Sequence, residues 1–215
     1  MFPERLIAGY RSFLAGRLPS ERSRFAALAE KGQRPEVMVI GCCDSRVSPE
    51  VIFDASPGEL FVVRNVANLV PPYAPDGDYH GTSAALEFAV QALKVKHIVI
   101  LGHARCGGIQ AFAEGAAPLS TGDFIGKWMT IVAPAAERLG PKEGEDYLAR
   151  LEQAAIAQSL DNLMTFPYVA ERVAAGQLFL HGAYFGVATG VLLVRNPEDG
   201  TFAPAAHDIP AQSSV

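Results

Sequence analysis

The chain has 215 residues, of which 49% are apolar and 19% charged, and 18 basic against 23 acidic side chains give a net charge of −5. Whole-chain disorder is excluded, because it requires low hydrophobicity and high charge, and the length suits one α/β domain rather than two. No basic cluster is dense enough to neutralise a run of phosphates, so we expect no nucleic-acid partner. We therefore treat residues 1–215 as a single domain.

The first 32 residues predict an N-terminal helical arm. Residues 4–16 and 20–31 alternate apolar and polar side chains with helical spacing, and Pro19-Ser20 separates the two segments. We expect these helices to pack on a partner subunit. Because charged residues recur from Glu4 onward, no apolar segment follows a basic start, so we expect no signal peptide and a cytoplasmic location.

Three short and mostly apolar runs predict a mainly parallel sheet. They cover residues 37–40, 60–63 and 97–101, and runs of this kind are typical of buried parallel strands. A helix predicted over 83–94 separates the last two, and strand–helix–strand units of this length imply right-handed crossovers. We expect an α/β fold with about four parallel strands flanked by helices.

The second half of the chain predicts further helices, over residues 107–113, 123–139, 145–163 and 167–175. Residues 176–194 contain no Asp, Glu, Lys or Arg, and their length alone fits a membrane span. Because Gln177, His181 and three glycines divide this segment, two strands over 178–183 and 187–194 explain it better, and we expect no membrane partner. We take the last strand as antiparallel and residues 196–215 as a loosely ordered tail.

Sulfur and imidazole groups follow two of the predicted strands. Cys42 and Cys43 come directly after the first strand, and His103 and Cys106 follow the third. The carboxyl ends of parallel strands meet at one edge of a sheet, so these side chains can surround one point. Two thiolates and one imidazole are zinc ligands, and three protein ligands with an open fourth position are typical of a catalytic zinc.

Each of these residues alone has a simpler explanation, because a single Cys at a strand end is more often a small buried hydrophobe than a ligand. The prediction of a metal site therefore depends on the combination. Three cysteines are also too few for a disulfide scaffold, which indicates a reducing compartment.

Longer motifs around these residues resemble the β-class carbonic anhydrases. The motifs are Cys42–Val47, Pro57–Asn68 and Gly102–Gly108, and the resemblance continues through residues 162–167 and His181-Gly182. It implies reversible hydration of carbon dioxide to bicarbonate and a proton, by attack of a zinc-bound hydroxide. The ligands of one Zn²⁺ per subunit would be Cys42, His103 and Cys106. The family commonly has serine where this chain has Cys43, which we expect to be packed and not a ligand.

The resemblance also assigns Asp44 and Arg46 as the catalytic pair. A bidentate guanidinium keeps a carboxylate ionised and fixes its direction, and we expect Arg46 to hold Asp44 in this way. Without the neighbouring motifs, two such residues would be an ordinary surface ion pair of little energetic weight.

The substrate pocket implied by the resemblance is apolar with few polar groups. Its residues would be Gln33, Phe61, Val66 and Phe88, with Gln33 contributed across the interface of a homodimer or higher homo-oligomer. The family commonly has tyrosine in place of Phe88, so one hydroxyl is missing here. Some members carry a tryptophan where this chain has Val39, which helps to form a bicarbonate pocket that favours aspartate-ligated zinc. We therefore expect the open form of the zinc site at neutral pH.

Two other functions fit part of the pattern. The same zinc site could hydrolyse carbon disulfide or carbonyl sulfide, with access to the pocket making the difference. A non-catalytic zinc-binding or redox module using Cys42, Cys43 and Cys106 is the second alternative. Asp44 and Arg46 argue against that module, because metal storage needs neither residue.

Overall fold

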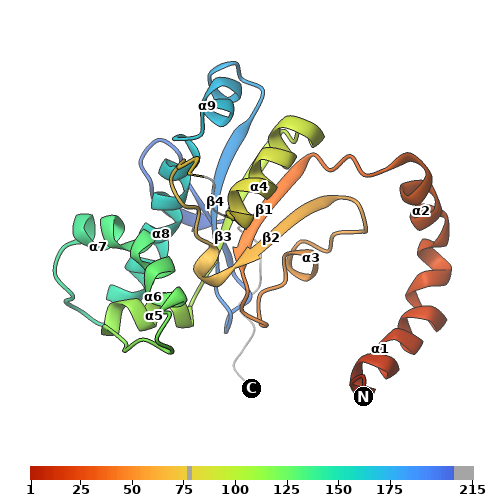
Figure 1. The fold of residues 1–215 in the computed structure, drawn as a ribbon, viewed down its shortest axis with the longest axis horizontal. Coiled ribbons are helices and arrows are strands. Elements are labelled where there is room, and N and C mark those ends of the chain that lie inside the picture. The colour runs from red at the N-terminus through yellow and green to blue at the C-terminus, as the bar shows by residue number, and fades with distance from the viewer. Residues whose placement is uncertain (77–78, 206–215) are drawn as a thin grey trace.

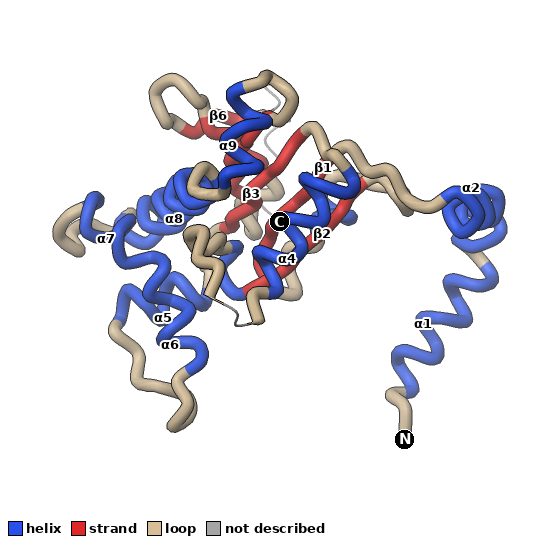
Figure 2. Tube along the Cα trace, turned by 45° about the horizontal axis from the view of Figure 1, so that its top comes forward, coloured by secondary structure: helices blue, strands red, loops and turns tan. Residues whose placement is uncertain are grey.

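The computed structural model describes residues 1–76 and 79–205. A twisted sheet with the strand order β2-β1-β3-β4-β5-β6 forms the centre of the described chain. Helices flank this sheet, whereas the two N-terminal helices stand clear of it as an arm (Figures 1 and 2). No helix in the described ranges has the length and apolar character needed to cross a bilayer.

The six strands are β1 (Val37–Cys42), β2 (Leu60–Asn65), β3 (His97–His103), β4 (Phe179–Phe185), β5 (Leu192–Arg195) and β6 (Phe202–Pro204). The pairs among β1 to β4 are parallel, and β5 and β6 are antiparallel to their neighbours. The expected mainly parallel sheet is thus confirmed, with two antiparallel strands at its C-terminal side instead of one. The strand predicted from residue 187 begins only at Leu192, because Gly186 and Gly190 close a turn in which Gly190 has a φ of 69°.

The helical segments are α1 (Glu4–Ala15), α2 (Arg17–Lys31), α3 (Pro49–Ile52), η1 (Val66–Asn68), α4 (Gly81–Glu87), η2 (Phe88–Leu93), α5 (Gly107–Glu114), α6 (Phe124–Met129), η3 (Thr130–Val132), α7 (Ala133–Leu139), α8 (Tyr147–Leu163) and α9 (Pro167–Ala174). The helix predicted over 83–94 is α-helical only to Glu87 and continues as the π-helix η2. The helix predicted over 123–139 is divided into α6, η3 and α7. Pro134 lies in the first turn of α7, where its missing N–H costs no hydrogen bond.

One face of the sheet carries the larger apolar core. Alternate residues of the central strands, such as Met38 and Ile98, are fully buried under side chains of α4, η2, α8 and α9. A second apolar cluster joins the carboxyl ends of the strands to α5, α6 and α8. The opposite face of the sheet carries a smaller cluster that includes Val39 and Leu101.

The N-terminal arm contributes nothing to these cores, because neither α1 nor α2 contains a buried residue. Arg24 of α2 forms a salt bridge of 3.1 Å with Glu59, close to the start of β2. At the other end of the chain, β6 lies inside the expected tail 196–215, and residues 206–215 of that tail lie outside the described residues.

Helix α8 approaches the sheet most closely where the strands carry glycine. A Cβ atom added at Gly102 of β3 would lie 2.6 Å from Cδ1 of Ile156 in α8, and one added at Gly182 of β4 would lie 2.9 Å from Cγ2 of the same residue. Glycine at these two positions therefore permits the contact that brings α8 behind the end of β3.

Candidate metal centre

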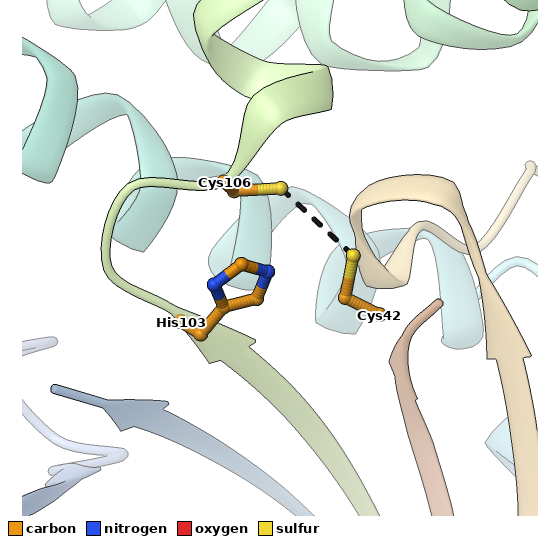
Figure 3. A group of neighbouring side chains, drawn as sticks. All are labelled: Cys42, His103 and Cys106. Atoms are coloured by element: carbon orange, nitrogen blue, oxygen red, sulfur yellow. Dashed lines mark hydrogen bonds between the residues drawn. The ribbon is translucent and has the colours of Figure 1, made fainter. Parts of the chain in front are cut away.

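The three expected metal ligands converge at the carboxyl ends of β1 and β3. Cys42 is the last residue of β1, His103 is the last residue of β3, and Cys106 directly precedes α5. Because β1 and β3 are neighbours in the sheet, their ends lie side by side (Figure 3). The two sulfur atoms are 4.0 Å apart, and the ligand atoms of all three residues lie within 4.8 Å of one another.

The environment of His103 fits a metal ligand. Its Nδ1 lies 3.0 Å from the carbonyl oxygen of Ala104, which can only accept, so Nδ1 carries the proton and Nε2 has a free lone pair. Nε2 is buried and has no hydrogen-bond partner in the described part of the chain. A buried nitrogen without a partner is unfavourable, and a metal ion held together with two sulfur ligands satisfies it.

The thiols of Cys42 and Cys106 are electrostatically linked. The hydrogen bond from Cys106 lowers the pKa of Cys42, and the same bond together with burial raises the pKa of Cys106. The backbone N–H of Ala67 also donates to the Cys42 sulfur at 3.4 Å, which favours its anionic form. The pair therefore shares one proton and offers a thiolate, which is the form of cysteine that binds metal.

Two residues beside the site have a strained backbone. Ala67 has a φ of 66° and Arg105 a φ of 55°, a region in which non-glycine residues cost about 1–3 kcal/mol each. The N–H of Ala67 contacts the Cys42 sulfur, and the carbonyl of Arg105 accepts a hydrogen bond of 3.0 Å from Arg46. The strain thus lies where backbone groups contact side chains of the site.

Asp44 and Arg46 form a close ion pair at the edge of this group. The guanidinium donates to both carboxylate oxygens, at 2.9 Å and 2.6 Å, and holds the pKa of Asp44 below its usual range. The Asp44 Oδ2 atom lies 3.9 Å from Nε2 of His103. Arg64 donates to the carbonyls of Cys42 and Asp44, so the turn that carries Asp44 is fixed from a second side. An ionised carboxylate is therefore held next to the expected metal position.

Two residues behind the converging Cys and His side chains were not predicted from the sequence. The carboxylate of Glu152 in α8 accepts hydrogen bonds from the backbone N–H of Cys106 at 2.8 Å and from the hydroxyl of Tyr184 at 2.6 Å. Both residues are buried, and burial raises the pKa of each of them. A signal existed, because Glu152 lies on the same face of its predicted helix as Ile156, and a charged residue on an apolar face needs a partner.

The expected pocket residues are not all brought to the ligands of the same chain. Val66 adjoins the site, since a Cβ added at Gly108 in the first turn of α5 would lie 2.8 Å from its Cγ1 atom. Phe61 and Phe88 contact one another, with ring centroids 5.9 Å apart. Phe61 pairs with Met38 of β1, which is four residues before Cys42, so it lies about 13 Å along the strand from the ligand.

Gln33 is exposed in the segment that joins α2 to β1, at the same distant end of the strands. The expectation that Cys43 is packed is wrong within the single chain, where its side chain is exposed. Cys43 follows the last residue of β1, and its backbone N–H still donates to the carbonyl of Asn65 in β2 at 2.8 Å. Because side chains of adjacent residues in an extended chain point to opposite sides, the Cys43 side chain does not point the same way as that of Cys42. Cys43 does not belong to the group of metal-ligating side chains.

The chain matches known proteins over most of its length. The family model described as carbonic anhydrase matches residues 37–192. Beta carbonic anhydrase 3 of Arabidopsis thaliana is 38% identical over 195 residues, which cover 87% of this chain and 74% of the relative. The chloroplastic beta carbonic anhydrase 5 of the same plant is 40% identical over 157 residues, which cover 71% of this chain and 52% of the relative.

Solved structures agree with these relatives. The structure of the beta-carbonic anhydrase CcaA has a TM-score of 0.83 and 31% identity, and covers 97% of this chain and 94% of its own. A tetrameric beta-carbonic anhydrase from Sordaria macrospora has a TM-score of 0.75 and 30% identity, with 93% and 98% covered. Since both the sequence match and the shared architecture include the strand ends that carry the Cys–His–Cys group, this chain belongs to the β class of carbonic anhydrases, a family of lyases.

Proposed function

We propose that this chain catalyses the reversible hydration of carbon dioxide to bicarbonate and a proton, with one zinc ion held by Cys42, His103 and Cys106. The observation that carries the proposal is the unpartnered, buried Nε2 of His103, which faces two sulfur atoms that are 4.0 Å apart. When bound, zinc would supply a hydroxide nucleophile near neutral pH, because it lowers the pKa of a coordinated water.

Asp44 and Arg46 orient the reacting groups in this proposal. Arg46 keeps Asp44 ionised, so that the carboxylate can only accept hydrogen bonds. An attacking hydroxyl that donates its hydrogen to Asp44 turns a lone pair toward the carbon of the substrate. Because the carboxylate is already held at both oxygens, little orientational entropy is lost when substrate binds.

A second copy of the chain completes the pocket in this proposal. Val66 supplies the apolar wall beside the ligands of its own chain, whereas Phe61, Phe88 and Gln33 lie near the opposite end of β1 and β2. Among the described strands β2 is an edge of the sheet, so these residues are available to line the site of a neighbouring subunit. The tetrameric state of the Sordaria macrospora relative supports a homodimer or a higher homo-oligomer.

The proposed location is the cytoplasm. All three cysteines are free, and two of them must stay reduced to bind metal, which suits a reducing compartment. Because one curated relative is chloroplastic, fractionation of the native cells is the deciding measurement.

Stopped-flow measurement of carbon dioxide hydration tests the proposed activity. We expect the zinc-loaded protein to be active, and the Cys42→Ser variant to lose both zinc and activity. Cys43→Ser is the matched control, because it removes a neighbouring thiol that is exposed and not a ligand. Hydration that persists after complete removal of zinc, or no hydration by fully loaded protein, would contradict the proposal.

A further inference from the structure

Glu152 is a buried carboxylate without a cationic partner. Its exposed fraction is 4%, and the salt bridges among the described residues do not include it. Its oxygens accept from two neutral donors instead, the Cys106 N–H and the Tyr184 hydroxyl. Burial disfavours a charge, and a neutral glutamine has the same shape, so packing alone does not explain a carboxylate here.

The loop that Glu152 contacts carries one of the expected metal ligands and directly follows another. Three consecutive residues of this loop are held by three different hydrogen bonds. The bonds are Ala104 N–H to the Phe185 carbonyl at 2.9 Å, Arg46 to the Arg105 carbonyl at 3.0 Å, and Cys106 N–H to Glu152 at 2.8 Å. Only the last of them acts on a residue whose side chain is itself a ligand. Without Glu152 the Cys106 N–H would lose its partner.

From this geometry we infer that Glu152 is a positioning residue for the metal, which fixes the Cys106 sulfur through its backbone N–H and is itself held by Tyr184. The inference rests on the proposed function only in taking Cys42, His103 and Cys106 as a metal site. Groups that hydrogen-bond to metal ligands change metal affinity by about 10- to 100-fold when they are replaced.

The test measures metal release rather than activity. Zinc-loaded protein is mixed with an excess of a chromophoric chelator, and the release rate is recorded for wild type, Glu152→Ala, Glu152→Gln and Tyr184→Phe. We expect release about 10- to 100-fold faster in Glu152→Ala and smaller increases in the other two. Protein loaded with Co²⁺ gives a second readout, because its visible spectrum reports the arrangement of the sulfur ligands and should change in Glu152→Ala.

Gln158→Ala is the matched control. Gln158 is a buried polar residue of the same helix, but its hydrogen bonds go to Arg138 and Asn162 instead of the ligand loop. We expect this variant to lower the stability of the metal-free protein without changing zinc release or the Co²⁺ spectrum. If Glu152 acts only on folding, its variants will behave like this control.

Wild-type release rates and an unchanged Co²⁺ spectrum in the Glu152 variants would overturn the inference. If Glu152→Ala does not fold, Glu152→Gln and Tyr184→Phe, which retain the shapes of the side chains, decide the question. Failure of the wild-type protein to bind Zn²⁺ or Co²⁺ would refute the proposed function and the inference together. Normal hydration with unaltered metal release in every variant would refute the inference alone.

Discussion

Replacement of Gly102 by alanine should push α8 away from the end of β3. The added Cβ would lie 2.6 Å from Cδ1 and 2.8 Å from Cγ1 of Ile156, and Cβ atoms essentially never approach other heavy atoms this closely. Ile156 is fully buried, so its neighbours leave no room to absorb the overlap. Overpacking of a closed core costs about 1–3 kcal/mol of stability. Because two such contacts form, we expect Gly102→Ala to lower the free energy of unfolding by about 2–3 kcal/mol.

A compensating change at Ile156 separates this cause from others. Ile156→Val removes Cδ1, the atom nearest to the added Cβ, and costs about 0.5–1.5 kcal/mol by itself. Independent effects would give the double variant a loss of about 2.5–4.5 kcal/mol. Because the valine lacks the atom that the alanine would strike first, we expect the double variant to lose at least about 1 kcal/mol less than that sum.

Urea unfolding of the metal-free protein, followed by the fluorescence of Trp128, measures these differences. All variants are compared at one protein concentration, because association of subunits adds to the apparent stability. Gly81→Ala is the control, since nothing lies within 4 Å of a Cβ added there. If the double variant is additive, or if Gly102→Ala is no worse than Gly81→Ala, then Gly102 does not set the distance between α8 and β3.

Three further predictions concern the catalytic pair, the metal and the pH dependence of stability. Arg46→Ala should keep its zinc but lose about 10- to 100-fold in kcat/KM, because the charged hydrogen bonds that orient Asp44 are gone. Stopped-flow rates together with zinc analysis measure this loss, and near-normal turnover would contradict it. Removal of zinc by a chelator should abolish hydration, and Zn²⁺ but not Mg²⁺ should restore it, because two sulfurs and an imidazole do not suit a hard cation. Burial and the neighbouring His97 lower the pKa of His181, so the folded state favours the neutral imidazole. The contribution of this group to folding stability is fully present above the unfolded pKa of about 6.5 and is lost as the pH falls through the folded pKa. The urea midpoint of the wild type should therefore fall more between pH 7 and pH 5 than that of His181→Gln, and equal slopes would exclude this contribution.

The convergence of Cys42, His103 and Cys106 was predictable because two local signals coincide with one topological rule. Apolar runs locate β1 and β3, and parallel strands present their carboxyl ends at one edge, so residues 42 and 103 meet although 61 positions separate them. The parallel sheet and its flanking helices followed from the same runs, and the structure confirms them.

Other features depend on contacts that no local pattern encodes. The strand expected from residue 187 begins five residues later, because the chain first closes a turn at Gly186 and Gly190. The change to a π-helix at Phe88 has no distinctive residue pattern. Glu152 lies 46 residues from Cys106, from whose N–H it accepts a hydrogen bond, and only the packing of α8 against β3 brings the two together.

The order of these residues along the chain has a consequence for biosynthesis. All three proposed metal ligands precede residue 107, whereas Glu152, which accepts from the Cys106 N–H, and Tyr184, which donates to Glu152, follow much later. A growing chain is made from its N-terminus, so the ligands leave the ribosome before either of these supports exists. A metal ion captured by the nascent chain therefore meets ligands that are not yet fixed. With these residues as the proposed metal ligands, we expect lasting metal incorporation only after β4 has joined the sheet.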